Sequence, residues 1–410
     1  MAFRAKAQND NLNTHFSWGN DTDITYAGEI EANTRLKQST HGNPPRADIH
    51  ILPSEIILND TVWNLHESTV TFDSGRISTN KLLIDHETGH LHIAGVAGPN
   101  PEDSLTIALE RIKLEYIFDI LQFHPVDFTG KASGNAVVKG ALKEPQADAK
   151  LYVEDFTFNG GLMGNMHLKG GWDHEIGVIL DADIKEESHP SHTLVKGYVS
   201  PKEKKLDLQI RANQTNLAFL NSFVGSIFKD VRGRATGDIH LHGPFKALCL
   251  EGKALADASA YAKILGTRFS FQQDSIHLEY DRIRFNEINI SDPAGGTAQI
   301  NGTLSHEHLG NMRYDFKISA QNFLIFNGDE KDESLPFHGS IYGTGNATLK
   351  GGNGILQVSG NMRTNPGSVF IYNAGSPEEI TNTDFVTFRD KTPRPQQYEL
   401  PELFRKRLSK

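Results

Sequence analysis

The chain has 410 residues, of which 38% are apolar and 22% charged, so it can form several structural units with a well-solvated surface. Its net charge of −10 argues against a nucleic-acid partner, because phosphate backbones are bound by basic patches or stripes. Cys249 is the only cysteine, which excludes an intrachain disulfide. The N-terminal segment lacks the apolar stretch of a signal peptide, and no apolar run reaches the roughly 18 residues of a membrane-spanning helix. We therefore expect either a protein that stays where it is made or a piece of a longer one.

Alternation of apolar and polar residues predicts β-strands along almost the whole chain. Gly, Asn, Asp and Pro clusters interrupt the alternation every ten or so residues, as in an antiparallel β protein with many turns. Two segments carry a helical pattern instead, EYIFDILQF at 115–123 and NLAFLNSFVGSIFKDV at 216–231. The clearest strands are LYVEDFTFNG, GVILDADI, KLDLQIRA, SIHLEYDRIRF and RYDFKIS, which begin at residues 151, 177, 205, 275 and 313.

Two series of markers indicate an internal repeat of about one hundred residues. The first is a skeleton of Asp, Gly, Ile and Gly, present at 85–95 and 292–302, with a degraded copy around Gly197. Its last glycines, Gly95, Gly197 and Gly302, are 102 and 105 residues apart. The second series is GNAVVKG, GDIHLHG and GNATLKG, which start at 134, 237 and 345, at spacings of 103 and 108 residues.

Repeats of fixed period predict stacked units that bury apolar surface against their neighbours. No Pro- or Ser-rich linker separates the copies, which favours a continuous β structure over tandem sandwich domains. We expect a partial first repeat at 1–128, complete repeats at 129–231 and 232–337, the start of a fourth at 338–390, and a poorly ordered, solvated tail at 391–410 that ends in FRKRLSK.

The motifs of common enzymes are missing. The sequence has no GxSxG, HExxH or GxxxxGK[ST], and its carboxylates form no recurring pair. HETGH (86–90) falls on a strand or turn, and the next clear copy of the repeat has PAGGT in its place. The histidines of HLH (240–242) and SHEHL (305–309) alternate with apolar neighbours, which predicts a solvated face. We therefore expect no catalytic residue, no metal site and no cofactor.

The alternation itself predicts an apolar face on every strand, and such a face has to be covered. It can pack as a sandwich, close as a solenoid, or curl into a trough that holds an apolar ligand. Periodicity alone does not separate these three arrangements.

Residues 230–326 resemble the TamB family of Gram-negative envelope proteins, in particular its Bacteroidetes form. The resemblance rests on the GRATG entry, the GPF turn with a following EG, the strand pair before ISD, the G-x-A-x-I-x-G return and LSHEHLGN. The preceding copy, with GNAVVKG and the Trp172 strand, is similar, as is the end, with RTNPGSVFIYNAG and DFVTFRDK.

The resemblance implies an elongated, repeating antiparallel β-sheet curled into an open groove, with short helices at the repeat junctions. It also implies a parent protein anchored in the inner membrane that extends across the periplasm. Such proteins are implicated in moving phospholipid to the outer membrane and in assembling outer-membrane proteins with a barrel partner. The anchor helix is absent here and the chain stops soon after FRDK, so we expect a fragment that ends before the C-terminal region of the family.

The family has no catalytic residues. The partners implied are phospholipid acyl chains and an outer-membrane barrel protein, with membrane contact only through the parent protein. The alternatives are a structural β-solenoid spacer or adhesin with a closed core, and a chaperone for barrel strands at the open sheet edge. The expected groove lining is Ile239, Leu241, Phe269, Phe271, Leu278, Tyr280, Ile283, Phe285, Ile300 and Phe316.

Overall fold

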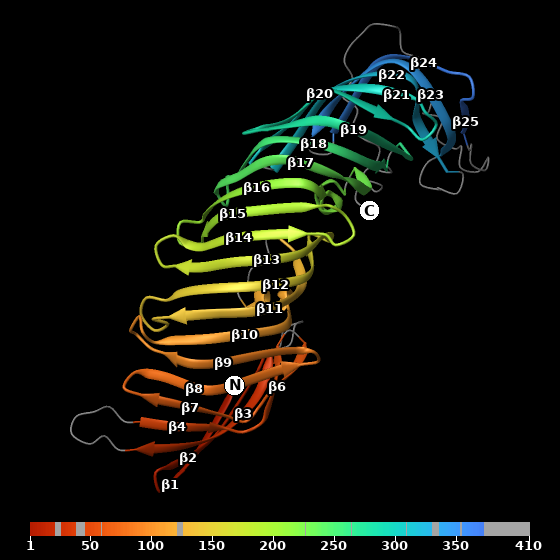
Figure 1. The fold of residues 1–410 in the computed structure, drawn as a ribbon. Coiled ribbons are helices and arrows are strands. Elements are labelled where there is room, and N and C mark those ends of the chain that lie inside the picture. The colour runs from red at the N-terminus through yellow and green to blue at the C-terminus, as the bar shows by residue number, and fades with distance from the viewer. Residues whose placement is uncertain are drawn as a thin grey trace, which may run out of the picture. The chain divides into compact units, whose positions relative to one another are not determined.

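The computed structural model describes residues 1–20, 26–37, 46–58, 60–120, 126–225, 227–263, 265–308, 310–329, 336–352 and 355–372. Two compact units divide the chain, Met1–Gln209 and Ile210–Lys410. The described residues form 25 strands with antiparallel pairing and a few short helices, which confirms the all-β prediction (Figure 1). The tail predicted at 391–410 lies outside the described residues.

The first unit is built from strands that mostly pair with the next strand along the chain. From β8 to β15 each strand pairs with its successor, whereas β3 also pairs with β5, β4 with β7 and β6 with β8. The strands are β1 (Ala2–Gln8), β2 (Asn11–Gly19), β3 (Ala27–Lys37), β4 (Arg46–Ile51), β5 (Ser54–Leu58), β6 (Thr61–Leu65), β7 (Ser68–Asp73), β8 (Arg76–His86), β9 (Gly89–Ala97), β10 (Ser104–Lys113), β11 (Phe128–Lys139), β12 (Gln146–Phe158), β13 (Gly161–Asp173), β14 (Gly177–Lys185) and β15 (His192–Ser200).

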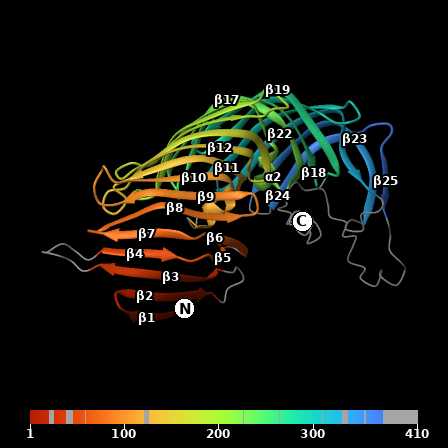
Figure 2. The ribbon, with the colours of Figure 1, turned by 60° about the horizontal axis from the view of Figure 1, so that its bottom comes forward.

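The second unit continues the meander with longer strands, which curve along their length (Figure 2). Strand β16 (Lys205–Asn216) contains the boundary between the units. The remaining strands are β17 (Phe228–Pro244), β18 (Cys249–Ala262), β19 (Thr267–Glu279), β20 (Arg282–Ser291), β21 (Thr297–Glu307), β22 (Gly310–Gly328), β23 (Phe337–Gly352), β24 (Ile355–Thr364) and β25 (Val369–Tyr372).

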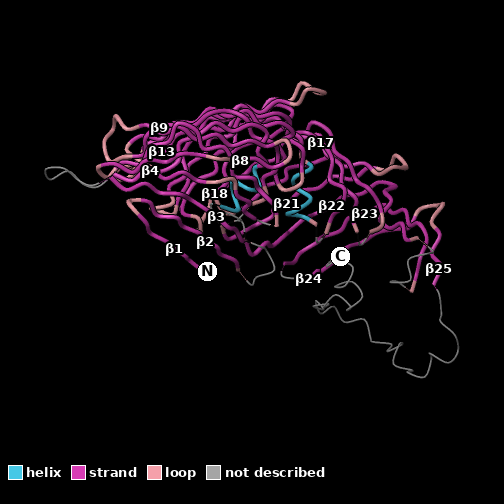
Figure 3. The backbone as a smooth tube through the Cα atoms, turned by 90° about the horizontal axis from the view of Figure 1, so that it is seen from below, coloured by secondary structure: helices cyan, strands magenta, loops and turns pink. Residues whose placement is uncertain are grey.

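Short helices occur at both positions where the sequence predicts them (Figure 3). The first is α1 (Leu114–Ile120); residues 121–123 of that prediction lie outside the described residues. The second is a 3₁₀ turn, η1 (Ala218–Leu220), followed by α2 (Asn221–Val224). The prediction of helix up to residue 231 is wrong, because the chain enters β17 at Phe228 and pairs there with Ala262 of β18.

A capped β-bulge accounts for the second repeat marker. In each copy one residue with positive φ interrupts the ladder and donates its backbone N–H to a hydroxyl on the next strand. That hydroxyl directly precedes the marker glycine at 134, 237 or 345. The donor–acceptor pairs are Arg111 N to Ser133 Oγ at 2.9 Å, Gln214 N to Thr236 Oγ1 at 3.0 Å, and Asn322 N to Thr344 Oγ1 at 2.9 Å.

Buried cores lie beside these bulges. In the first unit Trp63 is 5% exposed and meets the ring of Tyr116 from α1 edge-on at 5.2 Å. Phe118 of the same helix packs against Phe128 at 5.2 Å. In the second unit a cluster gathers from β20 to β22: Ile288, Ile290, Ala298, Ala320 and Phe323. A second buried cluster in this unit consists of Ala235, Ala254 and Ala256.

Candidate functional site

The second unit carries uninterrupted rows of apolar side chains on one face. Residues directly opposite each other in an antiparallel pair point to the same side of the sheet, so register identifies the members of a row. From β17 to β24 one such row is Gly237, Ala254, Ile276, Phe285, Gly302, Phe316, Leu349 and Val358. The neighbouring row from β17 to β23 is Ile239, Gly252, Leu278, Ile283, Leu304, Tyr314 and Gly351. Neither row contains a charged side chain.

The opposite face of the same strands is polar. One row there runs Asp238, Lys253, His277, Arg284, Thr303, Asp315 and Lys350. Lys350 and Asp315 form an ion pair at 2.9 Å. The apolar side is called the inward face below, and the polar side the outward face.

The first unit repeats this arrangement over eight strands, β8 to β15. Its Lys196 and Asp181 lie on the polar side and pair at 2.9 Å. One inward row is Leu82, Ile93, Ile107, Ala136, Ala149, Gly170, Leu180 and Gly197. A second is Ile84, Leu91, Leu109, Gly134, Leu151, Leu168, Ala182 and Val195.

Nine of the ten residues named from the sequence as groove lining lie on the inward face of the second unit by register, and Tyr280 lies in the turn between β19 and β20. Four of them, Phe269, Phe271, Phe285 and Ile300, pack against the buried cluster. Tyr280 is 55% exposed, and its ring meets His308 edge-on at 6.0 Å. The other five, Ile239, Leu241, Leu278, Ile283 and Phe316, are half-buried.

Several inward rings contact each other. Phe285 meets Phe316 edge-on at 5.5 Å across Gly302, and Tyr314 stacks on Phe316 at 6.4 Å. The hydroxyl of Tyr314 donates to the carbonyl of Ile355 at 3.0 Å. Burial raises the pKa of Tyr314 above its ordinary value of 10.0, so the phenol stays neutral and adds no charge to its row.

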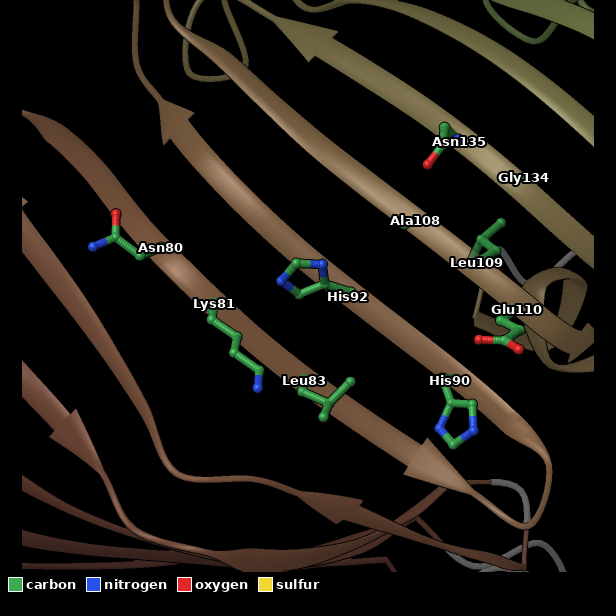
Figure 4. A pocket seen from close by; sticks show the side chains of 10 residues that line it. All are labelled: Asn80, Lys81, Leu83, His90, His92, Ala108, Leu109, Glu110, Gly134 and Asn135. Carbon is green, nitrogen blue, oxygen red and sulfur yellow. The ribbon is translucent and has the colours of Figure 1, made fainter.

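A hollow of about 710 Å³ in the first unit differs from these rows in its lining. It is lined by polar and charged side chains of β8 to β11 as well as by leucines (Figure 4). Glu110 lies opposite His90 in the register of β9 and β10, on the outward face. His92 and Ala108 of the lining lie on this face too, whereas Leu109 and Gly134 belong to an inward row, so most but not all of the lining is on the polar side.

The histidines of the three sequence motifs lie in different surroundings. In SHEHL, His306 is 4% exposed, so the prediction that it lies on a solvated face is wrong. In HETGH, Nδ1 of His86 lies 2.7 Å from the carbonyl oxygen of Val62, and His86 and Tyr116 meet edge-on at 6.2 Å. In HLH, His240 and His242 lie on the outward face of β17, opposite Glu251 and Cys249 of β18. Sequence reasoning missed Glu251 as a neighbour of this pair, because only the strand register brings it there.

The fold and the inward face define a repetitive antiparallel β protein whose distinguishing surface is a charge-free apolar stripe. Residues 286–408 match the family described as the TamB C-terminal domain. The predicted resemblance to TamB is thus confirmed for these residues, which lie in the second unit. The expectation that the chain ends before the family's C-terminal region is wrong, because these residues match part of that region.

TamB is a family of translocation and assembly modules of the cell envelope and is not known as an enzyme family. No curated protein and no solved structure matches the chain. Within the described residues no helix is both long and apolar enough to cross a membrane.

Proposed function

We propose that the inward face of each unit binds the acyl chains of phospholipids and conducts them between the inner and outer membranes. The observation that carries the proposal is the pair of apolar rows, which extend over seven or eight neighbouring strands without a charged side chain. The location that follows is the periplasm of a Gram-negative bacterium.

The free energy of hydration explains why such a surface is useful. Each methylene withdrawn from water contributes about 0.8 kcal/mol, so an acyl chain of about sixteen carbons contributes on the order of 12 kcal/mol. A lipid with two chains therefore crosses an aqueous compartment only if a protein replaces the water around them. A uniform row of aliphatic and aromatic side chains does this without trapping the lipid at one position.

The polar outward face and the missing catalytic motifs agree with this role. The headgroup can stay in water, so the proposal needs no dedicated polar pocket. The half-buried state of Leu278, Ile283 and Phe316 leaves apolar surface available, whereas a spacer or adhesin with a closed core would bury these side chains.

Site-specific photo-crosslinking tests the proposal with a matched pair of positions. A photoreactive residue at Phe316, on the inward face, should crosslink to phospholipid in cells, whereas one at the adjacent Lys317, on the outward face, should not. The same contrast is expected between Leu180 and Asp181 in the first unit. Equal lipid labelling at both members of each pair, or none at the inward positions, would overturn the proposal.

A second test of the proposal is to place a charged side chain on the inward apolar face. Leu278→Asp and Ile300→Lys should block lipid transfer in a complete parent protein while circular dichroism still reports the β fold. Lys317→Asp on the outward face is the control. Unchanged transfer in both inward variants would exclude conduction along these rows.

Assembly of outer-membrane barrels is a second candidate. Among the described residues β25 pairs with β23 alone, and its Phe370 and Tyr372 side chains are 57% and 58% exposed. An exposed strand of this kind can add a strand of another chain. Crosslinks from β25 to a barrel protein, with no lipid crosslinks at the inward positions, would favour assembly over lipid conduction.

A further inference from the structure

The outward face of the second unit holds a cluster that combines two imidazoles with a carboxylate. His240 and His242 are two residues apart on β17, so both point outward. Glu251 lies directly opposite His240 on β18. One ligand atom from each of the three residues lies within 4.8 Å of the others.

The three side chains already lie close to one another. Nε2 of His242 and Oε2 of Glu251 are 2.9 Å apart, and the two imidazole rings stack with 4.2 Å between their centroids. The side chains of His242 and Glu251 are 29% and 47% exposed, so solvent and dissolved ions reach them. Ligands of one tetrahedral zinc ion lie about 3.4 Å apart, which small side-chain rotations would achieve here.

From this geometry we propose that His240, His242 and Glu251 form a binding site for a divalent transition metal, with zinc as the first choice. Two imidazoles and one carboxylate suit zinc, copper(II) and nickel, whereas magnesium and calcium prefer oxygen ligands alone. Three protein ligands leave the remaining coordination positions to water. The metal would link β17 to β18 on the side of the sheet opposite the apolar rows, so the inference does not depend on the proposed lipid function.

The neighbouring cysteine, Cys249, is not one of the proposed metal ligands. Cys249 lies opposite His242 in the register, but its Sγ is directed to the carbonyl oxygen of Ala247 at 3.7 Å. The three-residue site proposed here excludes the thiol. Metal binding should therefore be unchanged in Cys249→Ser.

A second group of potential metal ligands among the described residues is His15 with Glu29 and Glu31. It offers a single imidazole whose two nitrogens lie 3.0 and 3.3 Å from different carboxylates. One imidazole nitrogen and two exposed carboxylates are a weaker ligand set for zinc. We expect His15→Ala to leave the zinc titration unchanged.

Calorimetric titration of zinc chloride into the metal-stripped 410-residue chain tests the proposal. We expect one saturable site per chain, and at least about a hundredfold weaker binding in His242→Ala and in Glu251→Gln, because loss of an outer-shell partner alone costs up to that factor. His277→Ala, on the same face outside the cluster, should bind like the unaltered chain. Cobalt(II) should give ligand-field absorption bands that both ligand variants lose.

Glu251→Gln preserves the shape of the side chain and so decides the question if His242→Ala does not fold. An unaltered chain that takes up no zinc would overturn the proposal. So would zinc binding that survives both ligand substitutions or disappears in His15→Ala.

Discussion

The complete skeleton of Asp, Gly, Ile and Gly occurs once in each unit, yet its two copies use the aspartate differently. Asp292 is buried and accepts backbone N–H groups from Ala294 at 2.7 Å, Gly296 at 3.0 Å and Leu324 at 2.6 Å. Asp85 instead accepts from the side chains of Asn64 at 3.1 Å and His66 at 2.6 Å.

Turn length causes the difference. The β8–β9 hairpin closes with His86 opposite Gly89, so two residues form its turn and Asp85 points outward. In the β20–β21 hairpin the backbone N–H of Asp292 bonds the carbonyl of Gly296 at 3.0 Å, which leaves three residues in the loop. This longer loop places Asp292 on the inward side, beside the buried cluster, because side chains alternate between faces along a strand.

The Ile and second Gly of the skeleton keep the same role in both units. Ile93 and Ile300 lie in inward rows, and a Cβ at Gly95 or Gly302 would collide with a carbonyl oxygen of the next strand. The shared requirement is thus close approach of neighbouring strands on the apolar face. The aspartate has no shared role: Asp292 caps its loop by accepting backbone N–H groups, whereas Asp85 forms surface hydrogen bonds with side chains.

The largest expected effect comes from the shared glycines. Gly95→Val and Gly302→Val should each destabilise their own unit by about 4 kcal/mol, because the branched side chain forces two strands apart. Hydrogen exchange monitored by mass spectrometry would report opening in peptides of the affected unit. Gly295→Asn is the control, since a Cβ there meets nothing within 4 Å and asparagine tolerates positive φ. Little change in either valine variant would remove the glycine explanation.

The next largest effect is a difference between the two aspartates in the local stability that each contributes. Asp292→Ala leaves buried N–H groups without their acceptor and should cost about 3 kcal/mol in local stability. Asp85→Ala removes surface hydrogen bonds and should cost less than about 1 kcal/mol. Hydrogen exchange in the two hairpins measures both changes, and equal losses would contradict the division of roles.

The isoleucines should behave alike. Ile93→Val and Ile300→Val each remove one methylene from an inward row and should cost about 1 kcal/mol. Exchange rates in β9 and β21 provide the comparison. A loss at only one site would show that the rows are packed differently in the two units.

The smallest expected effect is the loss of the stabilising contribution of Asp85 at acidic pH. The hydrogen bond from His66 holds the pKa of Asp85 below its ordinary value of 3.8. Ionised Asp85 therefore stabilises the fold above about pH 4, and the contribution, less than about 1 kcal/mol, is lost as the pH falls through the lowered pKa. The exchange difference between the unaltered chain and Asp85→Asn in β8 should shrink in that acidic range, and a difference that grew would reverse the assignment.

Much of the fold could be predicted from local pattern. Alternation predicts the strands around Leu278 and Phe316 and assigns their apolar sides, because the side-chain period of a strand is two. The helix at 216–231 was predicted too long, since pairing of Phe228 with β18 outweighs its helical pattern. The hydroxyls that cap the bulges, at Ser133, Thr236 and Thr344, directly precede the marker glycines of the repeat. The backbone N–H groups that they bind lie about twenty residues earlier in the chain, so local pattern could not identify these pairs.

By itself the sequence determined the all-β class, the hundred-residue period and the family resemblance, because alternation and repeated glycines are local properties of the chain. Only the tertiary structure decided which strands lie opposite each other. That register joins separate apolar residues into charge-free rows, turns Asp292 inward and Asp85 outward, and brings Glu251 to His240 and His242. Cross-strand pairing is a long-range property set by turn length and bulges, so one residue more in a turn changes the face on which an identical motif acts.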